Sequence, residues 1–111
     1  METNIKKLLT DIQQSILRIE QYTASLNNIT EYSSNTLVQN AVERNIEIIG
    51  EATNAILKIN AEIPISSARK IVNTRNQLIH GYDAVDVAMI WSIVRNHIPI
   101  LKQEVETLLA E

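Results

Sequence analysis

The sequence lacks cysteine and phenylalanine altogether, and it has only two glycines and two prolines. Without cysteine the chain can form neither a disulfide nor a thiolate metal site, which fits the reducing cytoplasm. Because aromatic residues make up only 4% of the chain, its core has to be aliphatic. The scarcity of glycine and proline leaves few turn residues, which argues against a fold of many short strands.

Long apolar runs are missing as well. No run approaches the roughly 18 residues of a membrane span, so the sequence predicts no contact with a membrane. The first residues, Met1 to Asn4, lack the basic and apolar regions of a signal peptide. We therefore expect a cytoplasmic protein whose 111 residues form one domain, over positions 1–111.

A general excess of positive charge is also lacking. The net charge of −3 does not favour binding of nucleic acid through bulk electrostatics. Between positions 69 and 95, however, four basic residues stand against two acidic ones, so this segment carries +2 and the rest of the chain −5. The sequence thus predicts a small positive patch on an acidic body.

What the chain does have is apolar residues at intervals of three and four, the period of an amphipathic helix. They form four stretches, over 5–26, 38–59, 68–79 and 85–109. The pattern predicts an all-α fold, an up-and-down bundle of four or five helices. The count depends on Pro99, which lies inside the last stretch and should kink or restart that helix. Gly50 inside the second helix costs about 1 kcal/mol relative to alanine, which suggests close helix packing there.

The expected ends of the third and fourth helices carry recognisable capping residues. Ser66 or Ser67 can cap the start of the third helix. Gly81 is placed to end that helix as a left-handed C-cap. Asp83 or Asp86 can then serve as the N-cap of the fourth helix.

The segment from Arg75 to Tyr82, with the sequence RNQLIHGY, stands out from these plain helices. It combines a permanently charged guanidinium, an amide, a titratable imidazole and a phenol within eight positions. We interpret it as the candidate chemical site of the chain.

Arg75 occupies the apolar stripe of the third helix, between Val72 and Leu78. A guanidinium does not lose its charge, so its burial requires a partner or an interface. One interpretation is a salt bridge to the second helix, through one of the residues Glu43, Glu47 and Glu51, or a side chain that extends to solvent. The other is a functional cation.

His80 follows five residues later, which places it about 140° around a helix from Arg75. The two side chains can converge only if the helix ends near His80 or if they come from two chains. An imidazole can exchange a proton near neutral pH. The alternative is a histidine that interacts with the helix dipole at a C-terminus.

Two further residues of the segment each have a functional and a structural interpretation. Asn76 could orient a phosphate or an attacking hydroxyl, or could be an ordinary surface residue. Tyr82 could be a modified or ligand-contacting phenol, or could fill one end of the bundle. The two histidines and the scattered carboxylates have no metal-site spacing, and no glycine-rich phosphate loop is present, so we expect neither a metal ion nor a cofactor.

The RNQLIHGY segment closely resembles the R-x4-H-x-Y signature of HEPN domains, in their HepT-like branch of ribonuclease toxins. Residues 41–52, which read AVERNIEIIGEA, resemble the second-helix signature of the same branch. Further similar residues are Val85, Asp86, Trp91 and the segment 99–101. The resemblance covers about residues 38–109 and rests on two separate motifs.

The resemblance implies a homodimeric helical bundle that cuts RNA without a metal ion. His80 would act as general base or acid on the ribose 2′-hydroxyl that attacks the adjacent phosphorus. Arg75 would stabilise the charge that develops on the phosphoryl oxygens, and Asn76 would position the phosphate or a water molecule. Two copies of the motif would share one cleft in the dimer.

The family also implies a partner, an MNT-type nucleotidyltransferase antitoxin that adenylylates the tyrosine matching Tyr82. The added AMP would bring bulk and negative charge into the cleft and switch the nuclease off. The resemblance thus implies the toxin of a type VII toxin–antitoxin pair. The alternative is a non-catalytic module that docks the nucleotidyltransferase and binds nucleotide or RNA without cutting it.

Overall fold

The computed structural model describes residues 2–80 and 86–111, and all regular secondary structure within these ranges is helical. The α-helices are α1 (Thr3–Thr23), α2 (Ile29–Ser33), α3 (Thr36–Ile59), α4 (Ala68–His80), α5 (Val87–Ser92) and α6 (Ile98–Leu109). A π-helix, η2 (Ile93–His97), joins α5 to α6. The prediction of an all-α fold is therefore confirmed.

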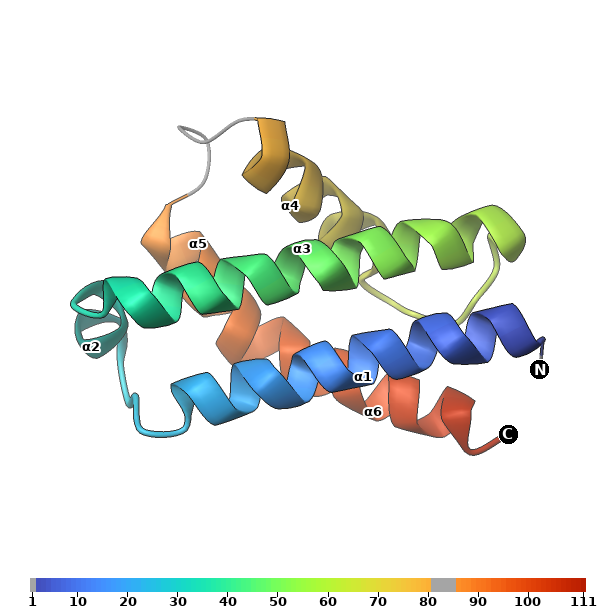
Figure 1. Cartoon of the computed structure of the whole chain (residues 1–111), viewed down its shortest axis with the longest axis horizontal. Helices are drawn as coiled ribbons and strands as arrows, with labels where there is room; N and C mark the ends of the chain where they lie inside the picture. The colour runs from blue at the N-terminus through green and yellow to red at the C-terminus, as the bar shows by residue number, and fades with distance from the viewer. Residues whose placement is uncertain (1, 81–85) are drawn as a thin grey trace.

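Helices α1 and α3 run side by side in opposite directions along the length of the molecule (Figure 1). Helix α6 packs on α1, and α4 packs on the other side of α3. The short α2 lies at one end, where it contacts α3 and the start of the last helical region. Helix α4 is inclined to α3, so its C-terminal end rises away from the body of the bundle (Figure 1).

The core lies between α1, α3, α4 and the last helical region, and it is built from aliphatic side chains as the composition predicts. Leu9, Ile12, Ile19 and Ile56 are completely buried. Each such side chain contributes about 1.5–3 kcal/mol through burial. Tyr32 of α2 is the one large aromatic residue among the fully buried side chains of the described chain.

Helix α2 was not anticipated from the sequence. Asn28 caps it, with the Asn28 side chain accepting a hydrogen bond from the Glu31 amide at 2.9 Å. The Glu31 carboxylate accepts in return from the Asn27 amide at 3.1 Å. This pairing of an asparagine with a glutamate three residues later is a variant of the capping box, in which the glutamate binds the amide before the cap, and it is the signal that could have revealed the helix.

The last helical region is divided near Pro99, as predicted. The α-helical ladder gives way to the π-helix at Ile93 and resumes at Ile98, with the proline in the first turn of α6. Proline is tolerated in the first turn of a helix because the backbone N–H groups of that turn have no acceptor within the helix, so the N–H that proline lacks is not needed. π-Helical segments are rare and are often found at functional sites.

Two capping predictions can be compared with the structure. Helix α4 begins directly after Ser67, whose carbonyl accepts from the Ile71 amide at 2.9 Å. Asp86 caps α5, with its carboxylate accepting from the Met89 amide at 2.7 Å. The predicted caps Gly81 and Asp83 lie outside the described residues.

Within the described ranges, none of the helices is long and apolar enough to cross a membrane.

Candidate active site on helix α4

Helix α4 carries three of the four predicted site residues. It continues without interruption from Ala68 to His80. Arg75 is half-buried, whereas Asn76 and His80 are exposed. The fourth predicted residue, Tyr82, lies outside the described residues.

Gly50 brings α3 and α4 into direct contact at Arg75. A Cβ atom built on Gly50 would lie 2.2 Å from the Arg75 Cβ and 2.8 Å from its Cγ. Neither atom is the far end of a flexible side chain, so any other residue at position 50 would push the two helices apart. The close packing expected at Gly50 is thus present, and it fixes the base of the Arg75 side chain.

The Arg75 guanidinium reaches past this contact without meeting a carboxylate. Its Nη1 donates to the Asn76 Oδ1 at 3.0 Å, and its buried Nε has no hydrogen-bond partner. Among the described residues Arg75 forms no salt bridge, so the interpretation of a bridge to α3 is wrong. A buried donor without a partner carries a free-energy cost of about 1–3 kcal/mol.

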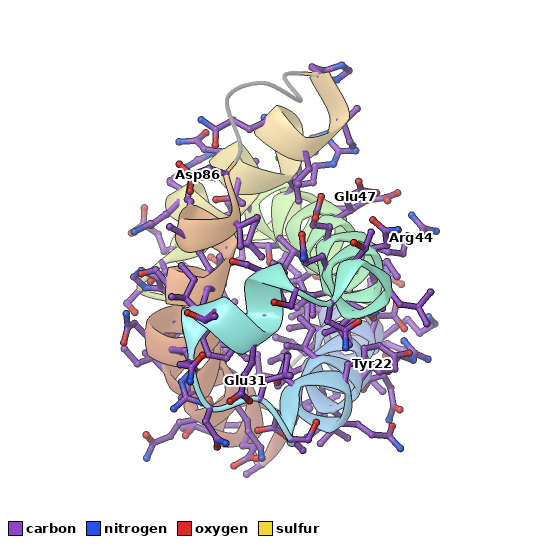
Figure 2. The ribbon with its side chains drawn as sticks, turned by 90° about the vertical axis from the view of Figure 1, so that its left-hand side faces the viewer. Tyr22, Glu31, Arg44, Glu47 and Asp86 are labelled. Atoms are coloured by element: carbon purple, nitrogen blue, oxygen red, sulfur yellow. The ribbon has the colours of Figure 1, made fainter. Side chains whose placement is uncertain are left out.

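The acidic side chains of α3 have other surroundings. Glu47 pairs with Arg44 one turn earlier at 3.6 Å, and Figure 2 shows both on α3, across the end of the bundle from Asp86. Burial raises the pKa of Glu43, and the Glu47 carboxylate raises it further. Glu43 lines a polar pocket together with Tyr32, Gln39, Asp86, Val87 and Ile90.

Tyr32 faces this pocket from α2. Its ring stacks on Trp91 with the ring centres 5.2 Å apart, and its buried hydroxyl has no hydrogen-bond partner. Burial, and then the Glu43 carboxylate, raise the pKa of the Tyr32 phenol well above its usual value. Tyr32 therefore remains a neutral structural residue, and it fills the end of the bundle.

His80 and Arg75 are not brought together within one chain. Because α4 is unbroken through His80, five residues still separate the two side chains by about 140° around its axis. His80 is the basic residue of the last turn of α4, the position at which a histidine complements the helix dipole.

A second histidine does contact α4. His97 of η2 lies with its Nε2 3.0 Å from the Lys70 Nζ. Desolvation by burial lowers the pKa of His97, and the Lys70 ammonium lowers it further. The neutral ring therefore accepts a hydrogen bond from Lys70. The spacing of the sequence does not predict this contact, because Lys70 and His97 are 27 residues apart.

No group of three or more histidine, cysteine, aspartate or glutamate side chains within residues 2–80 and 86–111 could hold a metal ion. What the site offers is an anchored arginine, an amide that orients it, and an exposed imidazole at the end of the same helix.

Comparison with known proteins identifies the family of this chain. The sequence model of the family described as "Ribonuclease HepT-like" matches residues 12–108. The chain belongs to the HepT-like family. The match includes both the second-helix segment and the RNQLIH segment of α4, so the resemblance seen in the sequence is confirmed.

Individual relatives agree over nearly the whole chain. "Probable ribonuclease HepT" of Thermococcus cleftensis is 36% identical over 112 residues, covering 97% of this chain and 98% of the relative. "Putative RNase MJ1380" of Methanocaldococcus jannaschii is 34% identical over 104 residues, covering 93% and 94% of the two chains.

A solved structure shows the same fold. It is the tri-AMPylated HEPN toxin of Shewanella oneidensis in complex with an MNT antitoxin, matched with a TM-score of 0.75 over 100% of both chains. The match establishes that this HepT-like chain has the HEPN toxin fold. Because the two chains are only 19% identical, the match establishes the fold alone.

Proposed function

We propose that this HepT-like protein is a metal-independent endoribonuclease, the toxin of a type VII toxin–antitoxin pair. The observation that carries the proposal is the Arg75 guanidinium, which is half-buried, anchored against Gly50 and without a carboxylate partner among the described residues. A cation held in this way is suited to a phosphate that arrives from solution. The printed names of the relatives, "Probable ribonuclease HepT" and "Putative RNase MJ1380", support RNA as the source of that phosphate.

The reaction would use the ribose 2′-hydroxyl of the substrate as nucleophile. His80 removes its proton, the 2′-oxygen bonds to the adjacent phosphorus, and the bond to the 5′-oxygen of the next nucleotide breaks. A protonated imidazole returns a proton to that leaving oxygen, which gives a cyclic phosphate and a 5′-hydroxyl. Arg75 stabilises the negative charge on the phosphoryl oxygens, and Asn76 holds the guanidinium in place.

This chemistry requires two protein groups that meet at one phosphate. Arg75 and His80 diverge on an unbroken helix of a single chain, so we propose that Arg75 of one chain meets His80 of a second chain. A homodimer with α4 from both chains beside one cleft satisfies this requirement, and it doubles the positive charge of the cleft.

We further propose that an MNT-type antitoxin adenylylates Tyr82. The support is that the HEPN toxin of similar fold is AMPylated and in complex with an MNT antitoxin. The Tyr82 oxygen would bond to the α-phosphorus of ATP, with pyrophosphate as the leaving group. The attached phosphodiester would add bulk and negative charge, which would oppose the binding of RNA phosphate.

A non-catalytic module is the second candidate. The exposed His80, with no hydrogen bond to a described residue that would orient its ring, favours it. Such a module would bind RNA or nucleotide through Arg75 and leave the strand intact.

Purified protein incubated with single-stranded RNA in excess chelator distinguishes the two. An endoribonuclease cuts the RNA and leaves 5′-hydroxyl ends, whereas His80→Ala and Arg75→Ala lower the rate by 100-fold or more. Both variants should retain the wild-type circular dichroism spectrum. Binding without cutting by the wild-type protein would favour the non-catalytic module.

A further inference from the structure

The solvent-facing side of α4 carries a continuous row of polar residues that ends at His80. The row consists of Arg69, Asn73, Asn76 and His80, and all four are exposed. Their spacing of four, three and four residues keeps them within about 60° of one another around the helix axis. The row extends about 16 Å, since an α-helix rises about 1.5 Å per residue.

The charge of α4 differs from that of the rest of the molecule. The helix contains three cationic residues and no acidic one, whereas the whole chain has a net charge of −3. None of the three forms a salt bridge with a residue in the described ranges. The cations of α4 are therefore available to a negatively charged ligand.

We propose that this row, with Lys70 beside it, is a binding track for the backbone of single-stranded RNA, which it guides to His80. The proposal rests on the proposed ribonuclease function and adds to it the positioning residues Arg69, Lys70 and Asn73. The Lys70 ammonium has three N–H donors, of which one contacts His97. It can thus give the other two to phosphate oxygens.

Two features favour RNA over an acidic protein as the occupant. The side chains of Asn73 and Asn76 can donate to phosphate oxygens and also accept from base edges, so the row offers more than charge. The row also leads to His80, and a strand on which His80 acts has to pass over this end of α4. An acidic protein would require neither feature.

Affinity for an uncleavable RNA tests the track directly. The probe is a fluorescent single-stranded RNA with a 2′-O-methyl group at every position, which removes the nucleophile but keeps the phosphates. We expect Arg69→Ala to weaken binding about three- to tenfold, and the dependence of log K on log salt to become less steep by about 0.7. Lys6→Ala, which removes an exposed lysine from α1, is the matched control and should bind like the wild-type protein.

A negative charge introduced without a change of shape gives a second test. Asn73→Asp should weaken binding of the same RNA more than Arg69→Ala does, because a carboxylate would then face the phosphates. Gln103→Glu makes the equivalent change on the exposed face of α6 and should have no effect. In cleavage assays the loss in both track variants should appear chiefly in KM, whereas His80→Ala loses kcat.

The outcomes distinguish a failure of the proposed RNA track from a failure of the proposed ribonuclease function. If the protein cuts RNA but Arg69→Ala and Asn73→Asp bind the probe with wild-type affinity, the track is wrong and the ribonuclease stands. If the variants lose affinity but the wild-type protein does not cut, the track stands and the catalytic assignment fails. A labelled poly-glutamate peptide that binds as tightly as the RNA would show a surface for acidic proteins and overturn the track.

Discussion

At the scale of single residues, the site depends on the contact between Gly50 and Arg75. Arginine is expensive to bury, and here its aliphatic stem is buried against the backbone of α3 while its guanidinium remains partly accessible. The hydrogen bond to Asn76 restricts the guanidinium further. We conclude that Gly50 positions Arg75 although it takes no part in the chemistry.

Gly50→Ala should therefore destabilise the protein and reduce its activity. Alanine is the better helix former by about 1 kcal/mol, but its Cβ would lie 2.2 Å from the Arg75 Cβ. Overpacking of this kind costs about 1–3 kcal/mol or more, so the net free energy of unfolding should fall. Urea unfolding measures the change, and RNA cleavage should decline through kcat.

A second substitution tests whether the clash with the Arg75 Cβ causes this loss of stability. Arg75→Gly removes the Cβ that clashes, so Gly50→Ala should cost less in that background than in the wild-type protein. If Gly50→Ala alone proves as stable as the wild-type protein, the close contact between α3 and α4 does not restrict position 50 to glycine.

The sequence allowed part of this site to be predicted. Arg75 is conspicuous in the sequence because it interrupts an apolar stripe, and Gly50 because glycine is unfavourable inside a helix. The partners of Arg75 could not be predicted, because three glutamates on α3 were all within plausible reach. Their distances depend on how α3 and α4 cross, and that crossing is fixed by packing of the whole core.

At the scale of elements, α4 is connected to the π-helix η2 by the contact between Lys70 and His97. Burial first, and then the Lys70 charge, lower the pKa of His97 below its ordinary value of 6.5. The folded state therefore protonates His97 less readily than the unfolded state does. The contribution of the neutral His97 ring to the free energy of unfolding is complete above pH 6.5, and it is lost as the pH falls below that value.

His97→Gln should therefore reduce the loss of stability on acidification. The glutamine amide can still accept from Lys70 but does not take up a proton. The measurement is the urea midpoint at pH 7.5 and at pH 5.5, compared with that of the wild-type protein. Lys70→Met should weaken the pH dependence without removing it, since burial is the larger cause. An unchanged dependence in His97→Gln would assign the acid sensitivity to other groups.

The long helices could be predicted from sequence, whereas their short companions could not. The apolar spacing over α1, α3 and α4 continues for several turns and is hard to mistake. Helix α2 has only five residues, too few for a period to be recognised, and its stability comes from the capping box and the burial of Tyr32. The exposed positions of Tyr22 and Ile59, both on predicted apolar stripes, show that the stripes become less buried toward the helix ends.

At the scale of the whole molecule, control by a partner should depend on Tyr82. Co-expression with an MNT-type nucleotidyltransferase should add AMP to the wild-type protein and abolish RNA cleavage. Tyr82→Phe should remain an active nuclease that the partner does not neutralise. Tyr22→Phe removes a different, exposed tyrosine and should be neutralised normally.

Intact-mass measurement after co-expression provides the direct readout. AMP adducts in equal amounts on the Tyr82→Phe variant, or none on the wild-type protein, would contradict control through this residue.

In the proposed dimer, Arg75 of one chain and His80 of the other act on one phosphate. The most direct test is to mix the inactive variants Arg75→Ala and His80→Ala after each has been dissociated, and to measure RNA cleavage in excess chelator. A mixed dimer then contains one complete site, made of His80 from the first variant and Arg75 from the second. We predict that random mixing restores about a quarter of the wild-type activity, since half of the dimers are mixed and each has one of two sites. If mixed dimers form, as native mass spectrometry would show, and the mixture cuts RNA no faster than either variant alone, the shared site is contradicted.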